Sequence, residues 1–414
     1  MRVNISAFAA ILCTAFAVDA IADTTLTVAA FPAIDQIVKL AIPAWKKQHP
    51  DIEIKVVSRE YADHHNAMTI ALATNASLPD VMAIEVGFVG RFSEGGGLED
   101  LSKVPYNIEQ YKSKFASFSF AQATIGDRIV SAMPADIGPG TLFYRQDILQ
   151  KSGINEAELI KSWDGFIETG KKIKAATGAY LVAHARDIKD IVIRSDLNSD
   201  EGIFFDKNNK ILVDGPRFVK AFQLAKKTRD AKLDAKIGAW SNEWSESLKR
   251  GAICTQMMGA WLGGHLANWL APNTKGLWRA TNLPENTYAS WGGTFYAIPK
   301  KTKNKELAWE FIKLMSLSRE IQIAAFKNQD AFPALLEAQN DPFINEPIEF
   351  LGGQKARPMW RDAANHIRSV TVNKYDYAAS EVIDNELDKV LDQGKDIQTA
   401  LTDAKALIER RARR

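Results

Sequence analysis

"IVSAMPADIGPGTLFYRQDIL" runs from Ile129 to Leu149 and joins two apolar segments through a short link. The first segment leads to Pro134, "GPG" follows at 138–140, and "TLFYR" then combines β-branched and aromatic residues. We interpret the two segments as strands. A link this rich in proline and glycine between two strands is a candidate hinge.

The chain before this stretch alternates between strand and helix patterns. Strands are predicted over three segments: Thr25–Phe31, 52–57 and 80–86. Between them, helical spacing runs from Ile34 to Trp45 and over 66–74, and Pro43 is expected to kink or restart the first helix. This β-α-β-α-β order predicts an α/β fold with a parallel sheet and right-handed crossovers.

Ligands of open parallel sheets bind beyond the carboxyl ends of the strands. The loops in that position are expected at Phe31–Gln36, Ser58–His65 and Glu85–Arg91. Within them, Asp63-His64-His65 looks like a metal-binding group. Neighbouring side chains on an extended segment point in opposite directions, however, so an exposed turn or a hydrogen-bonding role is favoured over a metal site.

The chain after the Pro/Gly link is mostly helical. Helices are predicted over 162–178, 218–233 and 304–316, and the C-terminal region carries one apolar helical face, with Ile383, Leu387, Val390 and Leu391. Asn304 is the expected N-cap of the third helix. Met257 and Met258 are expected to end a buried strand.

Trp261 stands among small residues in "MMGAWLGGH" (257–265). The ring either fills a core or stays open so that a ligand can lie on it, and the second interpretation is favoured. Trp240 and Trp244 are four residues apart, which favours one buried helical face for that pair.

Composition narrows the class of protein. The chain has 414 residues, too many for one core and suited to two domains or lobes. Lys and Arg number 52 and Asp and Glu 50, for a formal charge of +2 at pH 7. Nucleic-acid-binding proteins normally show a basic face, so this balance argues against that class.

Residues 1–22 have the pattern of a secretory signal peptide. Arg2 precedes an apolar run over 7–18, and the small residues of "AIA" (20–22) predict cleavage after Ala22. The residues before Cys13 are not the small pair of a lipoprotein signal. We therefore expect a soluble periplasmic protein.

The mature chain would retain one cysteine, Cys254, and so could form no internal disulfide. Its apolar surroundings favour a buried small hydrophobe over a nucleophile. No apolar run after Asp23 is long enough to span a membrane.

Motifs for catalysis and metal binding are absent from the sequence. There is no G-x-S-x-G, H-E-x-x-H, P-loop or G-x-G-x-x-G after a strand, and the six histidines lack metal-ligand spacing. We predict no catalytic residue, metal or cofactor. Glu85 and Asp136 each follow an apolar strand, and they are favoured as acceptors for sugar hydroxyls over a glycosidase pair.

Several segments, in this order, resemble the extracellular solute-binding proteins (family 1) of bacterial ABC importers, in the carbohydrate group that includes maltose-binding protein. The segments are "AWKKQHPDIEIKVV" (44–57), "ATNASLPDVMAIEVGFVGRFSEGGGLEDLS" (73–102), "MPADIGPGTLFYRQDIL" (133–149), "SWDGFIETGKKI" (162–173), "GAICTQMMGAW" (251–261) and "GGTFYAIPKKTKNKELAWEFIKLM" (292–315). The resemblance covers nearly the whole mature chain.

The resemblance implies the type II periplasmic binding protein fold, in which two discontinuous α/β lobes are joined by crossing hinge strands and close on a ligand. We expect an N-terminal lobe from 23–136 and 287–341, and a C-terminal lobe from 137–286 and 342–414. The implied partners are a small carbohydrate and the membrane permease subunits of an ABC transporter. We expect a monomer that binds no nucleic acid.

A sugar needs an aromatic plane for its apolar face and planar polar groups for its hydroxyls. Trp261 falls where the family has its ligand-stacking tryptophan. Gly292 and Gly293 would let the backbone approach the ligand or would serve a tight turn. The other candidates lie at the crossings, at strand ends or near the C-terminus: Trp291, Asp136, Glu85, Arg357, Trp360, Asp63, His64, Phe31 and Asp35.

These expectations describe a protein that captures a sugar for an ABC importer. Two alternatives remain open: a secreted glycoside-acting enzyme, and a binder of the same fold for a non-sugar solute such as a polyol phosphate. Arg59, Arg186 and Arg357 lie on candidate loops and also leave an anionic sugar open.

Overall fold

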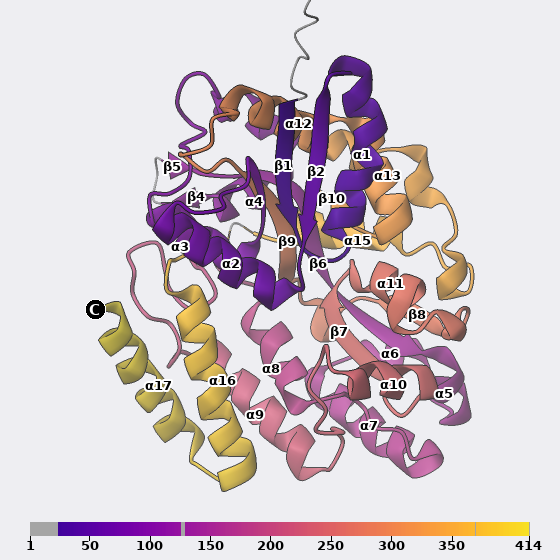
Figure 1. Cartoon of the computed structure of the whole chain (residues 1–414). Helices are drawn as coiled ribbons and strands as arrows, with labels where there is room; N and C mark the ends of the chain where they lie inside the picture. Colours follow the sequence, from indigo (N-terminus) through magenta and orange to yellow (C-terminus); the bar gives the residue numbers. More distant parts are fainter. Residues whose placement is uncertain (1–23, 126–128, 369, 414) are drawn as a thin grey trace, which may run out of the picture.

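The computed structural model describes residues 24–125, 129–368 and 370–413 (Figure 1). The predicted signal peptide lies outside the described residues. The first elements are β1 (Thr24–Ala30), α1 (Ile34–Gln48), β2 (Ile52–Ser58), α2 (Tyr61–Thr74), β3 (Val81–Glu85) and α3 (Val86–Glu94). β1 pairs in parallel with both β2 and β3, so the predicted β-α-β-α-β unit is confirmed.

α1 continues through Pro43 as one helix, so the predicted restart is wrong, and the predicted kink stays a prediction. Pro43 lies on the exposed side of α1. Lys39, whose carbonyl has no N–H partner at Pro43, is also exposed, so water can replace the missing hydrogen bond.

The stretch around the Pro/Gly link forms a long strand. The structure has a short β5 (Ile129–Val130) and then one unbroken, fully buried strand, β6 (Met133–Arg145), instead of two strands with a link. Its pairing with β9 (Ser290–Ala297) shifts register twice, between Pro134 and Asp136 and between Ile137 and Pro139. A proline cannot donate to the ladder, and such irregularities let a strand accept it.

β6 belongs to two groups of strands. Its first part lies in the sheet order β10-β6-β9-β3-β1-β2, with β10 at Phe332–Pro333. Its second part pairs on one side with β7 (Thr255–Gly259) and on the other with β8 (Trp278–Thr281). β6 therefore passes from the upper half of the molecule in Figure 1 into the lower half.

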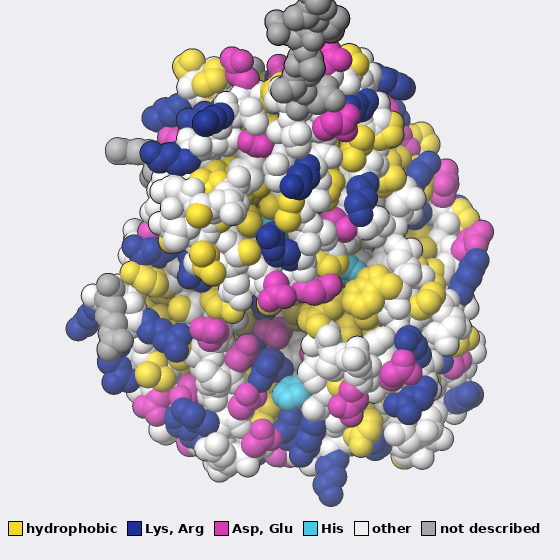
Figure 2. Space-filling view, viewed as in Figure 1, with side chains coloured by type: hydrophobic (Ala, Val, Ile, Leu, Met, Phe, Trp, Pro, Cys, Tyr) yellow, Lys and Arg dark blue, Asp and Glu magenta, His cyan; other side chains and the backbone are white. Residues whose placement is uncertain are grey.

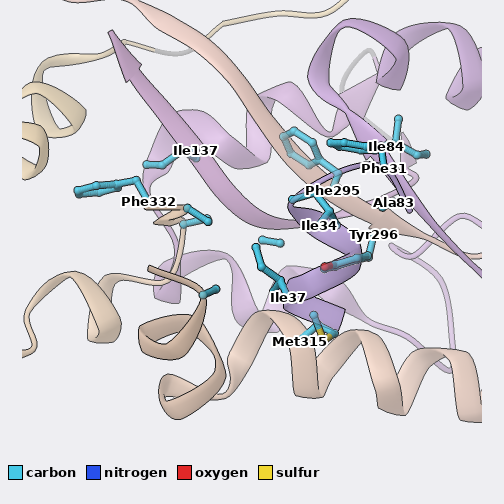
Figure 3. Close-up of a cluster of buried hydrophobic side chains, with 14 of the residues drawn as sticks. Phe31, Ile34, Ile37, Ala83, Ile84, Ile137, Phe295, Tyr296, Met315 and Phe332 are labelled. Carbon is cyan, nitrogen blue, oxygen red and sulfur yellow. The ribbon is translucent and has the colours of Figure 1, made fainter. Parts of the chain in front are cut away.

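The upper half is built on the six-stranded sheet. α12 (Lys305–Leu317) and α13 (Arg319–Gln329) pack with α1. Figure 3 shows apolar side chains of α1 and α12 in one buried cluster with those of β3, β6 and β9. Asn304 precedes α12 as predicted, but its side chain does not cap the helix and donates instead to Asp80 Oδ1 at 3.2 Å. We call this half the first lobe.

The lower half, the second lobe, surrounds β7 and β8 with helices. These are α5 (Gln146–Lys151), α6 (Glu156–Ile160), α7 (Trp163–Thr177), α8 (Ala185–Ile193), α9 (Pro216–Asp230), α10 (Asn242–Arg250) and α11 (Leu262–His265). Cys254 is fully buried in the second lobe, as predicted.

The C-terminal helices are α15 (Arg357–His366), α16 (Asp376–Gln393) and α17 (Ile397–Ala412). α16 and α17 pack on α9 through the predicted apolar face, with Ile383, Leu387 and Val390 buried. α16 also reaches α3 of the first lobe, where the Tyr377 and Phe88 ring centroids are 4.9 Å apart. No helix within the described ranges is long and apolar enough to cross a bilayer.

Candidate ligand-binding site

Trp261 lies just after β7, where β6, β7 and β9 meet. Its indole Nε1 donates a hydrogen bond to the backbone oxygen of Trp291 at 2.8 Å. A Cβ added to Gly138, Gly259 or Gly292 would lie 3.0, 2.3 or 2.9 Å from this Nε1. The small residues around Trp261 thus make room for the edge of the indole itself, and the ring is half-buried rather than fully covered.

Gly292 and Gly293 lie within β9, and both have positive φ angles, of 78° and 133°. Glycine alone adopts such angles at little cost. A Cβ on Gly293 would meet the backbone oxygen of Asp136 at 3.0 Å. These two glycines therefore make room for the indole of Trp261 and for the neighbouring strand β6.

Trp291 packs against the hydrophobic clusters of both lobes and is half-buried. The guanidinium carbon of Arg194 lies 4.7 Å from the centroid of its ring. Arg194 follows α8 in the second lobe and is held by Asp190, whose carboxylate accepts from Nη1 at 3.1 Å. A cation thus covers part of the Trp291 ring, in the arrangement of a cation–π pair.

Glu85 and Asp136 come from strands on either side of β9. Both pair with Thr294, Glu85 from β3 and Asp136 from β6. Burial raises the pKa of the Asp136 carboxyl to about 6, against the opposing effect of hydrogen bonds from Thr294. Burial also raises the pKa of Glu85, while Arg194 acts in the opposite direction. Arg194 and Asp136 therefore both act on the Glu85 carboxyl, Arg194 lowering its pKa and Asp136 raising it.

On the first-lobe side of this site, His65 connects Tyr61 and Glu85 by hydrogen bonds. The Tyr61 hydroxyl and the Gly87 N–H donate to Glu85 Oε2 at 3.0 and 2.8 Å. His65 links Tyr61 and Glu85 through their backbones, because its Nδ1 lies 2.8 Å from the Tyr61 backbone oxygen and its Nε2 accepts from the Glu85 N–H at 3.2 Å. Burial lowers the pKa of His65 to about 3, so the ring is neutral and can both donate and accept.

The expected loop Ser58–His65 is wrong, because α2 begins at Tyr61. Asp63 is exposed in the first turn of α2, where a carboxylate favours the helix dipole. His64 is fully buried and its Nε2 lies 2.8 Å from the Ala83 oxygen. His64 therefore belongs to the core of the first lobe. It lies neither in an exposed turn nor where a ligand could contact it.

Phe31 and Asp35 occupy the first βα junction. Phe31 is nearly buried beneath Tyr61, with ring centroids 5.8 Å apart, and so supports that side chain. Asp35 lies in the first turn of α1, and its Oδ2 accepts from Gln36 and Lys39 at 2.9 and 3.3 Å. Its polar contacts are therefore local to α1.

Arg357 and Trp360 lie inside the junction of the lobes. The Arg357 guanidinium stands 4.0 Å from the Phe343 ring and 3.8 Å from the Asp330 carboxylate. Trp360 is fully buried, with Phe143 and Phe326 ring centroids at 6.4 and 6.3 Å. Both positions are interior, so we remove these residues from the set expected to touch a ligand.

A protein-family model described as bacterial extracellular solute-binding protein matches residues 30–320. The chain belongs to this family. An arabinooligosaccharide-binding protein of Bacillus subtilis is 26% identical over 67% of this chain and 66% of its own length. A lactose-binding protein of Rhizobium radiobacter is 25% identical over 85% of this chain and 82% of its own.

Solved structures confirm the predicted fold class. A crystal structure of an extracellular solute-binding protein of family 1 covers 94% of this chain and 99% of its own, with a TM-score of 0.79 at 20% identity. An ABC-transporter-associated binding protein of B. animalis subsp. lactis, in complex with β-1,6-galactobiose, covers 93% and 97% with a TM-score of 0.77 at 23% identity. This solute-binding protein therefore has the type II fold.

Sequence reasoning did not single out several residues that the structure places at or beside the candidate site. Arg194 and Tyr61 had no motif to mark them, and His65 was noted only within the Asp63-His64-His65 group. Trp240 was assigned to one buried helical face with Trp244, but only Trp244 is buried, and Trp240 precedes α10. Ser241 could have signalled this, since its side chain caps α10 by accepting from the Trp244 N–H at 3.1 Å.

The part of the solute-binding protein that the structure describes contains no candidate metal site. No group of three or more His, Cys, Asp or Glu side chains there could hold a metal ion. The polar groups between the lobes are instead suited to a ligand that donates and accepts hydrogen bonds.

Asp330→Asn should change how stability depends on pH. Burial raises the pKa of Asp330 to about 7, while Arg357 opposes the shift. An aspartate in the unfolded chain titrates near ~3.9, so ionising Asp330 in the folded state costs stability as pH rises through this window. The free energy of unfolding of the variant, relative to the parent protein, should rise by about 2 kcal/mol between pH 5 and 8.

Chemical denaturation across that pH range measures this difference. Asp63→Asn is the matched control, because Asp63 is exposed. Curves for Asp330→Asn and the parent protein that stay parallel with pH would show that Asp330 ionises normally in the folded state.

Proposed function

We propose that this protein captures a sugar between its two lobes and delivers it to an ABC importer. The observation that carries the proposal is the half-buried indole of Trp261 beside a junction lined by Glu85, Asp136 and Arg194. An aromatic plane with acceptors and a planar donor matches the apolar face and hydroxyl rim of a sugar. The relatives named for arabinooligosaccharides and lactose support the same ligand class.

The proposed movement is closure of the lobes about β6 and β9. The proposed lobe boundaries are the expected ones, 23–136 with 287–341 and 137–286 with 342–414. The crossing of β6 from its β9 partner to its β7 partner at Pro139–Gly140 supports the first of these boundaries. Permease subunits would contact both lobes of the closed monomer.

We propose that the protein binds its sugar and releases it chemically unchanged. Glu85 and Asp136 are separated by the whole of β9, so their backbones lie two strand spacings, roughly 10 Å, apart. Glycosidases hold their two carboxyl groups ~5–5.5 Å apart when they retain and ~6.5–9.5 Å apart when they invert. The proposal of capture is supported by the relatives, which are named as binding proteins, and recovery of the bound glycan tests it. We further propose that the protein is periplasmic after signal cleavage behind Ala22, which the mass of the exported protein would test.

A glycan binding screen followed by ligand recovery tests this function. Purified protein is incubated with neutral, acidic and amino sugars, and native mass spectrometry records what binds. We expect one sugar per chain, recovered unchanged. Cleaved glycan would support the glycoside-acting alternative, and binding confined to polyol phosphates would support the non-sugar alternative.

Asp136→Ala should weaken sugar binding by more than ~1 kcal/mol, because a ligand hydroxyl would lose a buried acceptor. Isothermal titration with the sugar from the screen gives the affinity. Asp63→Ala, at an exposed position on α2, should leave it nearly unchanged. Equal affinities for the two variants would remove Asp136 from the site.

A further inference from the structure

Two further tryptophans continue from Trp261 along the second lobe. The ring centroids of Trp261 and Trp240 are 6.0 Å apart with 22° between their planes, and those of Trp240 and Trp269 are 6.4 Å apart with 24°. The three indoles therefore form a row of nearly parallel rings. We call Trp240, Trp261, His265 and Trp269 the tryptophan row.

His265 holds this row together. Its ring is nearly perpendicular to all three indoles, at 82–88°, with centroid distances of 5.5–5.7 Å. The Trp269 Nε1 donates to His265 Nδ1 at 2.9 Å, and burial lowers the pKa of His265 to about 4. A neutral imidazole can accept this bond, so the orientation of Trp269 is set before any ligand arrives.

The local backbone brings these side chains to one surface. Trp261, His265 and Trp269 follow one another at intervals of four residues, on α11 and the single π-helical turn Leu266–Leu270. Such π-turns occur frequently at functional sites. Trp240 arrives from the loop before α10 with a φ of 70°, which is a strained conformation for a bulky residue.

The outer two indoles are open to solvent. Trp240 and Trp269 are 52% and 51% exposed, whereas Trp261 is half-buried. Figure 2 shows hydrophobic side chains gathered where the two halves meet, over the region of β7 and α11 in Figure 1. Two large rings held rigidly and left exposed are an unusual surface for a protein that does not use them.

Asn268, the residue before Trp269, carries an amide side chain beside the row. The Asn268 Nδ2 donates to the Asn328 oxygen at 2.8 Å and lies 3.3 Å from Gln329 Oε1. Amide groups both donate and accept hydrogen bonds, as the hydroxyls of a neutral sugar require. Indole faces with a neighbouring amide therefore suit the apolar face and the hydroxyls of a neutral glycan.

We propose that Trp240 and Trp269 form an additional subsite, which takes the outer units of a neutral oligosaccharide whose inner unit lies at Trp261. This inference rests on the proposed function and names its ligand more closely as an oligosaccharide. Continuity of the row with Trp261 assigns the occupant, because a glycan that extends from Trp261 would reach the exposed parts of Trp240 and Trp269. Each sugar unit that reaches the row would increase the affinity of the protein for the oligosaccharide.

Affinity as a function of chain length tests the subsite. Isothermal titration uses linear oligosaccharides of one to four units built from glucose, galactose or arabinose. The parent protein should bind the longest member of the preferred series at least tenfold more tightly than the shortest. Trp269→Ala and Trp240→Gly should lose this gain and keep the affinity for the shortest, with Trp240→Gly suited to the positive φ.

Val104→Ala is the matched control, since Val104 is an exposed apolar residue of the first lobe. Binding of sugars with no dependence on length would overturn the subsite and leave the proposed function standing. Failure to bind any sugar would overturn both. Variants that bind every length normally but fail in uptake with the reconstituted importer would assign the row to permease contact and overturn the subsite.

Discussion

Trp261→Ala should weaken sugar binding about 100-fold, or ~2.7 kcal/mol, and leave a folded protein. The ring is half-buried, and its nearest neighbours on β6, β7 and β9 are glycines, which cannot replace its flat face. Titration with the preferred sugar gives the affinity, and circular dichroism reports folding. Loss of folding would mean that Trp261 serves the core, and an unchanged affinity would remove it from the site.

Trp261→Phe separates stacking from the hydrogen bond to the hinge. The phenyl ring keeps an apolar face but cannot donate to the Trp291 oxygen, which now accepts from Nε1 at 2.8 Å. We expect an intermediate affinity, because the platform remains but is no longer held against β9. An affinity as low as that of Trp261→Ala would show that the hydrogen bond, and not the ring face, governs binding.

Gly138→Ala should destabilise the protein by about 3 kcal/mol or more. A Cβ at this position would lie 1.7 Å from the Trp291 oxygen and 2.6 Å from its carbonyl carbon. Both atoms are backbone, so β6 and β9 would have to separate at the point where the lobes join. Thermal and chemical unfolding measure the loss.

Gly238→Ala is the matched control for that substitution. No atom lies within 4 Å of a Cβ added to Gly238, and its φ is not in the left-handed region. Its unfolding temperature should stay within a degree or two of the parent value. Equal stability of the two variants would show that β6 and β9 can move apart freely.

Much of the fold follows from local sequence patterns. Alternation in "IEIKVV" and the apolar run "DVMAIEV" led to β2 and β3, and helical spacing led to α1, α7, α9 and α12. The errors fall where tertiary contacts outweigh local preference. Gly138, Pro139 and Gly140 indicated a link between two strands, yet pairing with β9 and β7 keeps β6 extended through them.

The candidate site was harder to predict from the sequence than the fold. Trp261, Asp136 and Glu85 were proposed from a resemblance and from strand ends, and the structure places each at the junction of β3, β6, β7 and β9. Trp360 and His64 matched the chemistry of a sugar site but are fully buried. Residue type alone does not reveal which side of an element faces the core.

The sequence by itself determined the order of strands and helices, the family, and the small residues that surround Trp261. The tertiary structure alone decided that Arg194 covers Trp291, that His65 joins Tyr61 to Glu85, and that Trp240 continues the row from Trp261. The physical reason is distance along the chain. Periodicity reports which face of one element is buried, whereas these contacts arise where the crossing strands bring remote segments together.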